Sequence, residues 1–235
     1  MNISASMIYR WAKDLFPICR SITGNGVRET LAYIKEIVSE LSIYEVKTGE
    51  NVFDWTIPLE WNCCSGHIID PNGEIVVDFE NNNLHVMSYS EPINKVMSLV
   101  ELDKHLYSIK DIPDAIPYKT SYYNKDWGFC LSDQKRQALI NGDYKVVIDS
   151  TLEPGSLSFA DILIQGETDQ EILLSTYTCH PSMANNETSG MVIATALALW
   201  LKNQPNRRYT YRIVFVPETI GAVAYLHKNH LKMKE

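Results

Sequence analysis

The stretch from residue 171 to residue 190 constrains the fold of this chain more than any other. It begins with the apolar run Ile172-Leu173-Leu174, which is short enough for a buried strand, and it continues to His180. Pro181 cannot continue a hydrogen-bonded ladder, so the strand must end there. A polar loop follows, and an apolar helical run begins after Gly190. A strand that ends at a histidine and leads through a polar loop into a helix is typical of α/β enzymes, and it predicts that the chemistry lies at this edge of the sheet.

Strands and helices alternate around this stretch. The predicted strands cover residues 144–148, 158–164, 172–177 and 210–216, and the predicted helices cover about 188–203 and 219–233. A strand–helix–strand–helix order requires crossover connections, so the sheet is predicted to be at least partly parallel. The first of these helices is apolar on almost all sides, and we expect it to be buried against the sheet.

The first part of the chain has a different pattern. Helical spacing predicts helices over residues 7–18 and 27–41, and Pro17 ends the first of them. From about residue 45 the pattern becomes the alternation of strands, with a hairpin predicted around an Asn72-Gly73 turn. Further strands are predicted over residues 52–57, 84–89 and 95–100. We therefore expect three segments, namely N-terminal helices over 1–44, an inserted β-rich domain over 45–118 and an α/β segment over 119–235.

Composition excludes several classes of partner. The chain has 21 Lys and Arg residues against 29 Asp and Glu, a net charge of −8. A nucleic-acid or anionic-membrane surface would require the opposite sign, so neither partner is expected. No segment has the length of a membrane span, and the N-terminus has no signal-peptide core. Five cysteines without a CxxC spacing indicate reduced thiols and a cytoplasmic protein.

The candidate chemistry follows two of the predicted strands. His180 follows one strand, the polar loop over 185–187 comes next, and Glu218 follows the strand that ends at Val216. If the two strands are neighbours, these groups converge at one sheet edge. A histidine, a loop carboxylate or amide, and a second glutamate are the parts of a catalytic zinc site, in which the metal polarises a carbonyl and the glutamate takes a proton from bound water.

The same residues have a structural interpretation. A single histidine at the end of a strand often only satisfies a hydrogen bond in the core. Glu218 alone could equally cap the helix that follows it or pair with a nearby cation. Spacing leaves both interpretations open.

Two motifs carry a resemblance to a known family. They are His180-Pro181-Ser182-Met183-Ala184-Asn185 with Ser189-Gly190, and Val216-Pro217-Glu218-Thr219-Ile220-Gly221. With the stretches 52–58, 127–130 and 148–157, they resemble bacterial proteins with a zinc-aminopeptidase-like domain. Those proteins often carry the label of polysaccharide-biosynthesis or domain-of-unknown-function proteins. The resemblance implies an α/β fold, a zinc-aminopeptidase-like mixed sheet sandwiched by helices and interrupted by a small β-rich inserted domain.

The resemblance also implies roles for individual residues. His180 matches the first zinc ligand and Glu218 the general base. Thr219 stands where the wider superfamily often has a second ligating glutamate, so a two-zinc site is not expected. Asn186 replaces the aspartate that would be a metal ligand, and a neutral amide oxygen is a poorer zinc ligand. Glu187 could substitute for it, although adjacent residues on a helix point about 100° apart. We therefore expect zinc to bind weakly or not at all.

The resembling proteins continue well past the position of Glu235. On this basis we expect a C-terminally truncated chain whose sheet flank is covered by a homo-oligomer or a partner. Two function classes stay open. One is an impaired zinc-dependent aminopeptidase-like hydrolase that acts on a peptide or a small amide substrate, and the other is a non-catalytic relative that serves as a binding or scaffold module.

Overall fold

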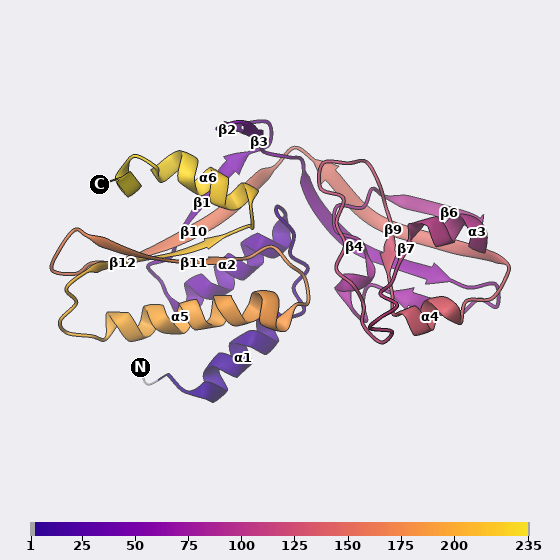
Figure 1. Cartoon of the computed structure of the whole chain (residues 1–235), viewed down its shortest axis with the longest axis horizontal. Coiled ribbons are helices and arrows are strands. Elements are labelled where there is room, and N and C mark those ends of the chain that lie inside the picture. Colours follow the sequence, from indigo (N-terminus) through magenta and orange to yellow (C-terminus); the bar gives the residue numbers. More distant parts are fainter. Residues whose placement is uncertain (1–2, 235) are drawn as a thin grey trace. The chain divides into compact units, whose positions relative to one another are not determined.

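The two strands predicted around the histidine lie side by side in the computed structural model, which describes residues 3–234 (Figure 1). By its internal contacts the chain divides into a first unit, Met1–Glu60 with Pro154–Glu235, and a second unit, Trp61–Glu153.

The first unit contains one four-stranded sheet, a short hairpin and four α-helices among the described residues. Its strands are β1 (Ser42–Lys47), β2 (Asn51–Val52), β3 (Trp55–Thr56), β10 (Ser156–Ile164), β11 (Glu171–Tyr177) and β12 (Thr210–Val216). Its helices are α1 (Ala5–Leu15), α2 (Asn25–Ile37), α5 (Ser189–Lys202) and α6 (Ile220–Asn229), with a π-helical turn at Ala184–Thr188 and a 3₁₀ turn at Lys232–Lys234.

The sheet of the first unit has the strand order β1-β10-β12-β11. β11 and β12 are parallel, with Tyr177 opposite Val216, whereas β10 is antiparallel to both of its neighbours. The predicted parallel pairing is thus confirmed. Parallel strands in register end at the same edge of a sheet, and this brings the residues after Tyr177 and after Val216 together.

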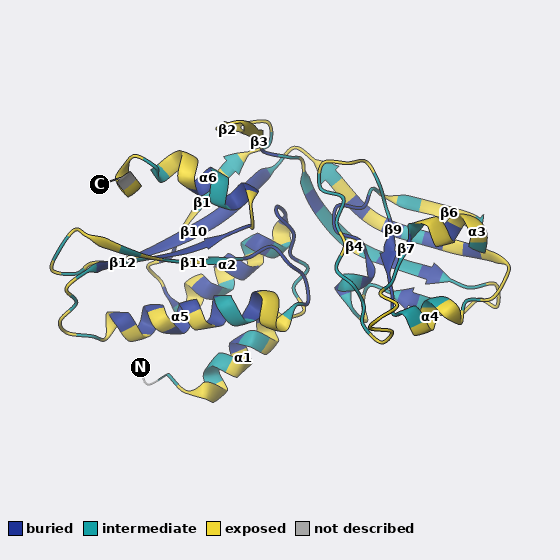
Figure 2. Ribbon diagram, in the orientation of Figure 1, coloured by how far each residue is buried: buried dark blue, intermediate teal, exposed yellow. Residues whose placement is uncertain are grey.

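Helices cover both faces of this sheet (Figure 1). α2 and α5 lie on one face, α1 packs on α5, and α6 lies on the other face. β10 and β12 are buried along most of their length (Figure 2). Burial of a side chain the size of Phe159 or Phe215, both 0% exposed, stabilises the fold by roughly 1.5–3 kcal/mol. The predicted mixed sheet between helices is confirmed.

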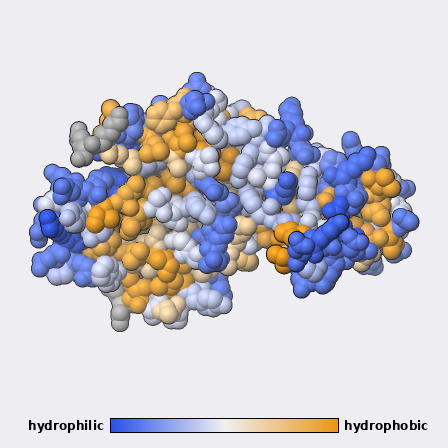
Figure 3. Space-filling view, in the orientation of Figure 1, coloured by the Kyte–Doolittle hydropathy of each residue, from blue (hydrophilic) through white to orange (hydrophobic). Residues whose placement is uncertain are grey.

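α5 differs from its prediction in one respect. It was predicted to be apolar on almost all sides and buried against the sheet, yet its apolar residues Ile193, Leu197 and Trp200 are 48%, 39% and 52% exposed. These residues recur at helical spacing and form one face, while Met191 and Ala198 on the opposite side are fully buried. Apolar side chains gather over α1 and α5 on the face of the molecule shown in Figure 3.

The second unit is mainly β-structure. Its strands are β4 (Glu60–Ile69), β5 (Ile75–Asp78), β6 (Ile93–Ser98), β7 (Leu106–Tyr107), β8 (Phe129–Cys130) and β9 (Asp143–Glu153). Short helical elements are α3 (Leu99–Leu102), α4 (Asp133–Gln137) and 3₁₀ turns at Asn83–His85 and Asp103–His105. The main sheet has the order β5-β4-β9-β6. β4 and β5 form the predicted hairpin around Asn72-Gly73, where Gly73 takes the positive φ of 87° that the turn requires.

The boundaries of the second unit, Trp61–Glu153, differ from those of the β-rich segment predicted over 45–118. β1, at 42–47, pairs with β10 and so belongs to the first unit. Residues 119–153 supply β8, α4 and β9 to the second unit, and β9 pairs with β6 along six positions from Ile93 to Ser98. A change of hydrophobic period marks where strands occur, but it does not show which sheet each strand joins.

Two predicted strands are wrong. Residues 52–57 form parts of the two-stranded β2–β3 hairpin, in which Phe53 has a φ of 55°. Residues 84–89 begin in a 3₁₀ turn, because the Asn82 side chain accepts a hydrogen bond from the Leu84 N–H and caps it, and they end at Tyr89 with a φ of 67°. None of the helices within residues 3–234 is both long and apolar enough to cross a bilayer.

Candidate functional site

The candidate site lies where β11 and β12 end. The Thr178 N–H donates to the Val216 carbonyl at 2.9 Å, so the ladder continues one residue beyond β11. His180 then turns inward and is 5% exposed, while Glu218, two residues after β12, keeps 52% of its side chain exposed. The parallel register thus brings together the two residues that the sequence singled out.

His180 has a carboxylate beside each ring nitrogen. Nδ1 lies 2.9 Å from Oε2 of Glu187, and Nε2 lies 3.2 Å from Oε2 of Glu218. With the Nδ1–H donated to Glu187, Nε2 is left facing Glu218. Two ligand atoms of a tetrahedral zinc ion, at about 2.0–2.1 Å from the metal, lie roughly 3.3 Å apart. The Nε2–Oε2 spacing therefore suits either a shared cation or a carboxylate placed beside a metal-binding nitrogen.

The π-helical turn at Ala184–Thr188 separates the two loop candidates. Thr188 closes the turn, because both its N–H and its hydroxyl donate to the Met183 carbonyl, at 3.1 and 2.9 Å. Glu187 points inward and is 1% exposed, whereas Asn186 is exposed and its amide oxygen accepts a hydrogen bond from the Tyr177 hydroxyl at 2.7 Å. Glu187 thus contacts Nδ1 of His180, the ring nitrogen that faces away from Glu218, and this contact orients the ring.

Cys179 is a third potential ligand that the sequence did not single out. Its sulfur accepts a hydrogen bond from the Glu218 N–H at 3.1 Å, and its ligand atom lies within 4.8 Å of those of His180 and Glu218. Burial raises the pKa of the Cys179 thiol well above its ordinary value, and the negative charge of Glu187 adds to this. The thiol is therefore neutral, and a cation would have to displace its proton before the sulfur could bind.

The backbone is strained on both sides of the site. Ser182 has a φ of 40° and Thr219 a φ of 59°, and neither is glycine. Residues held in such conformations cost about 1–3 kcal/mol each and concentrate at functional sites. After Glu218 the chain must also turn closely on itself, because a Cβ on Gly221 would lie 2.5 Å from the Pro217 ring.

Arg20, in the loop between α1 and α2, is the second residue that sequence reasoning missed. It is 0% exposed, its Nε donates to the His180 carbonyl at 3.0 Å, and it lies 3.9 Å from Oε1 of Glu187. Burial lowers the pKa of its guanidinium, and the Glu187 carboxylate partly offsets this effect. The sequence showed only a polar turn at this position, and no local pattern pointed to a partner 160 residues away.

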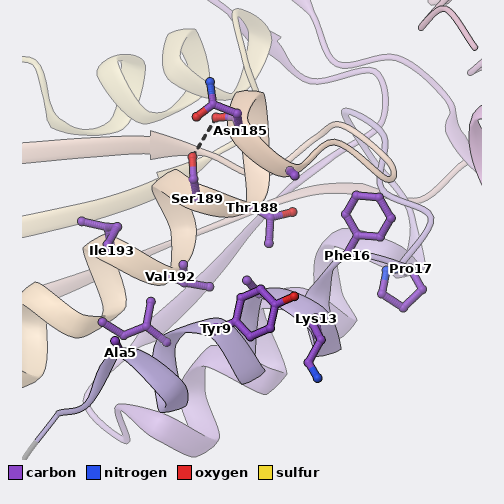
Figure 4. A pocket seen from close by; sticks show the side chains of 13 residues that line it. Ala5, Tyr9, Lys13, Phe16, Pro17, Asn185, Thr188, Ser189, Val192 and Ile193 are labelled. Atoms are coloured by element: carbon purple, nitrogen blue, oxygen red, sulfur yellow. Dashed lines mark hydrogen bonds between the residues drawn. The ribbon is translucent and has the colours of Figure 1, made fainter. Parts of the chain in front are cut away.

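An apolar groove of about 1000 Å³ begins on the outer side of the same π-helical turn (Figure 4). Tyr9 and Phe16 from the α1 side face Val192 and Ile193 of α5 across it, and Asn185 lies at one end. His180, Glu187 and Glu218 do not line this groove.

Comparison with known proteins identifies relatives along the whole chain. The model of a family described as a domain of unknown function (DUF4910) matches residues 9–235. A protein from Clostridium acetobutylicum, named as a polysaccharide biosynthesis protein with an aminopeptidase-like domain, is 51% identical over 227 residues, which are 97% of this chain and 52% of that protein. The chain thus spans about half the length of the curated relative it matches.

Solved structures show the same relation. A crystal structure from Clostridium acetobutylicum, named for a peptidase, superimposes with a TM-score of 0.94 at 50% identity and covers 97% of this chain and 54% of that one. Two structures at 11% identity share the fold alone. A peptidase M28 precursor from Shewanella amazonensis has a TM-score of 0.63 and covers 98% and 69% of the two chains. A zinc aminopeptidase from Bacillus subtilis has a TM-score of 0.59 and covers 94% and 63%.

These relatives confirm the resemblance read from the two motifs, and the fold class with it. The chain belongs to the DUF4910 family and has an aminopeptidase-like fold.

Proposed function

We propose that this chain carries part of the site of a zinc-dependent, aminopeptidase-like hydrolase, and that the site binds zinc weakly. The observation that carries the proposal is the placement of Nε2 of buried His180 3.2 Å from the half-exposed carboxylate of Glu218, at the shared end of two parallel strands. The names of the relatives and the zinc aminopeptidase fold support the same class of chemistry.

The residues present fit zinc in part. An imidazole nitrogen whose other nitrogen is held by a carboxylate is a preferred zinc ligand, and His180 with Glu187 has this arrangement. A catalytic zinc takes three protein ligands and keeps one position for water or substrate. In residues 3–234, Cys179, His180 and Glu218 form the group of metal-ligating side chains that converges here, and the Cys179 thiol is neutral. With Glu218 acting as the base, two ligands remain, and one of them must lose a proton before it can bind, so we expect weak binding.

Each residue has a role in the proposal. His180 binds zinc through Nε2, and Glu187 keeps the ring in the orientation that allows it. Zinc, when bound, polarises a substrate carbonyl and acidifies water. Glu218 is the general base, because its carboxylate is adjacent to the metal-binding nitrogen and open to solvent, to which it can pass a proton. The substrate is a peptide or a small amide.

The Glu218→Gln variant tests whether Glu218 acts as the general base or as a zinc ligand. If Glu218 is the base, zinc affinity stays near that of the wild-type chain and any chelator-sensitive turnover is lost. A loss of zinc affinity equal to that of His180→Ala would show instead that Glu218 is a ligand. Equilibrium dialysis with zinc, together with hydrolysis of a panel of aminoacyl chromogenic amides, measures both quantities.

A second candidate function is a non-catalytic binding module. It is favoured by Asn186, whose neutral amide is engaged by Tyr177 and faces solvent at the position where the resemblance implies a ligating aspartate. On this account we expect residues 1–235 alone to show no aminopeptidase turnover above background with zinc, cobalt or manganese. Clear turnover that is abolished by a chelator and by Glu218→Gln would exclude the non-catalytic alternative.

A further inference from the structure

Arg20 connects three separate segments of the first unit. Its Nη1 donates to the Leu15 carbonyl at 2.6 Å and to the Thr30 hydroxyl at 3.3 Å, and its Nε donates to the His180 carbonyl at 3.0 Å. These partners belong to the end of α1, to α2 and to the segment after β11. One fully buried side chain thus fixes the position of the His180 backbone against two helices.

The same guanidinium stands beside Glu187. Nε of Arg20 is 3.9 Å from Oε1 of Glu187, and both side chains are 0% exposed. A buried charge is very costly without a partner of opposite sign, so each of these two side chains makes the burial of the other possible. Among the described residues, Oε1 of Glu187 has no hydrogen-bond partner, which leaves Arg20 as the cation that compensates it.

The second carboxylate oxygen of Glu187 extends this contact to the ring of His180. Oε2 is 2.9 Å from Nδ1, while Nε2 on the opposite side of the ring is 3.2 Å from Glu218. Arg20, Glu187 and His180 are far apart in the sequence but form one continuous buried chain of contacts. That chain ends at the nitrogen that faces the half-exposed Glu218.

We infer that Arg20 is a positioning residue of the site. It holds the Glu187 carboxylate and the His180 backbone together, so that Nδ1–H is donated inward and Nε2 is presented to Glu218. The inference deepens the proposed function, on which it rests for the use of Nε2 as a metal ligand. A lysine could supply the charge, but a single ammonium cannot reach Leu15, Thr30 and His180 at once as the planar fork of arginine does.

The direct test requires no metal. In the metal-free chain with ¹⁵N-labelled histidine, the Nδ1–H of His180 is assigned by comparison with His180→Ala, and its exchange with water is measured by NMR. We expect a protected proton in the wild-type chain. In Arg20→Lys we expect exchange to be faster by roughly tenfold or more, because the charge remains but the threefold contact is lost.

A second variant guards against a failure to fold. The single variant Arg20→Met would leave the Glu187 carboxylate buried without a cation and could fail to fold. The double variant Arg20→Met/Glu187→Gln removes both charges and is used in its place. We expect the double variant to fold, to lose the protection of the ring N–H, and to bind zinc about 10–100-fold more weakly, as is typical when the partner of a ligating histidine is altered. Arg28→Met is the matched control, because Arg28 pairs with Glu60 away from the site, and it should leave the ring N–H unchanged.

The outcomes are distinguishable. Unchanged protection of the Nδ1–H in folded Arg20→Lys and in the folded double variant would overturn the positioning role and leave Arg20 as a support of the helices only. Equal loss of protection in Arg28→Met would overturn it as well. Absence of zinc binding in the wild-type chain would instead contradict the proposed function, while the NMR measurement would still decide the role of Arg20.

Discussion

The two sides of His180 are built differently. On the inner side, Glu187 and Arg20 are buried and carry opposite charges, and Glu187 also forms a hydrogen bond with the ring of His180. On the outer side, Glu218 keeps half of its side chain in solvent and Asn186 is exposed. The inner side fixes the ring, and the outer side leaves one nitrogen accessible. A residue on the inner side should therefore matter for stability, and a residue on the outer side for binding.

Unfolding measurements give the largest expected contrast. Arg20→Met removes one partner of a buried ion pair, so the free energy of unfolding should fall by about 3–5 kcal/mol. Glu218→Gln changes a half-exposed side chain, so it should change the free energy of unfolding by no more than about 0.5 kcal/mol. Urea denaturation followed by circular dichroism measures both, and similar losses in the two variants would remove the distinction between the two sides.

Thiol reactivity tests how closed the inner side is. Cys179 lies beside His180 in the core, and burial raises its pKa, so at pH 8 it holds even less thiolate than an ordinary cysteine. Cys64 is exposed. We expect iodoacetamide to label Cys64 at least about 100-fold faster than Cys179, because only the thiolate reacts and only Cys64 is accessible. Mass spectrometry of peptides after timed labelling reads the ratio, and rapid labelling of native Cys179 would show that the site opens to solvent.

On the outer side, Asn186→Asp sharpens the comparison. The new carboxylate would be exposed, one residue before Glu187 in the π-helical turn, so its added charge should raise zinc affinity only by roughly two- to fivefold. The matched variant Asn185→Asp adds the same charge to a neighbouring exposed residue that lines the outer groove, and it should have a smaller effect. Competition with a fluorescent chelator measures both, and an equal gain in the two variants would assign the effect to general charge.

A substitution on the exposed face of α5 should have the smallest effect on the free energy of unfolding. Trp200 is 52% exposed at the end of the apolar face that also contains Ile193 and Leu197. Trp200→Ser should change the free energy of unfolding by no more than about 0.5 kcal/mol. If a second copy of the chain covers this face, the variant should elute later on size exclusion. A large loss of stability in a monomeric chain would show that Trp200 is part of the core.

The sequence predicted the fold better than it predicted the site. The strand–helix order around His180 predicted a partly parallel sheet. His180 and Glu218 were expected at one sheet edge if their two strands were neighbours, and the β11–β12 pairing meets that condition. The sheet to which the strand at 42–47 belongs could not be predicted, because an alternating pattern does not show which strand β1 pairs with.

Within the site, the sequence did not show in which direction the side chains of the 184–188 turn point, nor which residues far apart in the sequence come together. A π-helical turn changes the direction in which successive side chains point, and this sends Glu187 inward and Asn186 outward. A regular helix would have been assumed from the sequence. Arg20 was not foreseen, because its burial depends on partners contributed by α1, α2 and the segment after β11, none of which is visible in its local sequence.

Zinc binding by the wild-type chain tests the central claim most directly. After incubation with zinc and gel filtration, elemental analysis should find zinc bound at less than one equivalent per chain, and equilibrium dialysis should show a weak site that is lost in His180→Ala. Zinc contents that are equal in the wild-type chain and in His180→Ala would contradict the account, because His180 would then have no part in binding the metal.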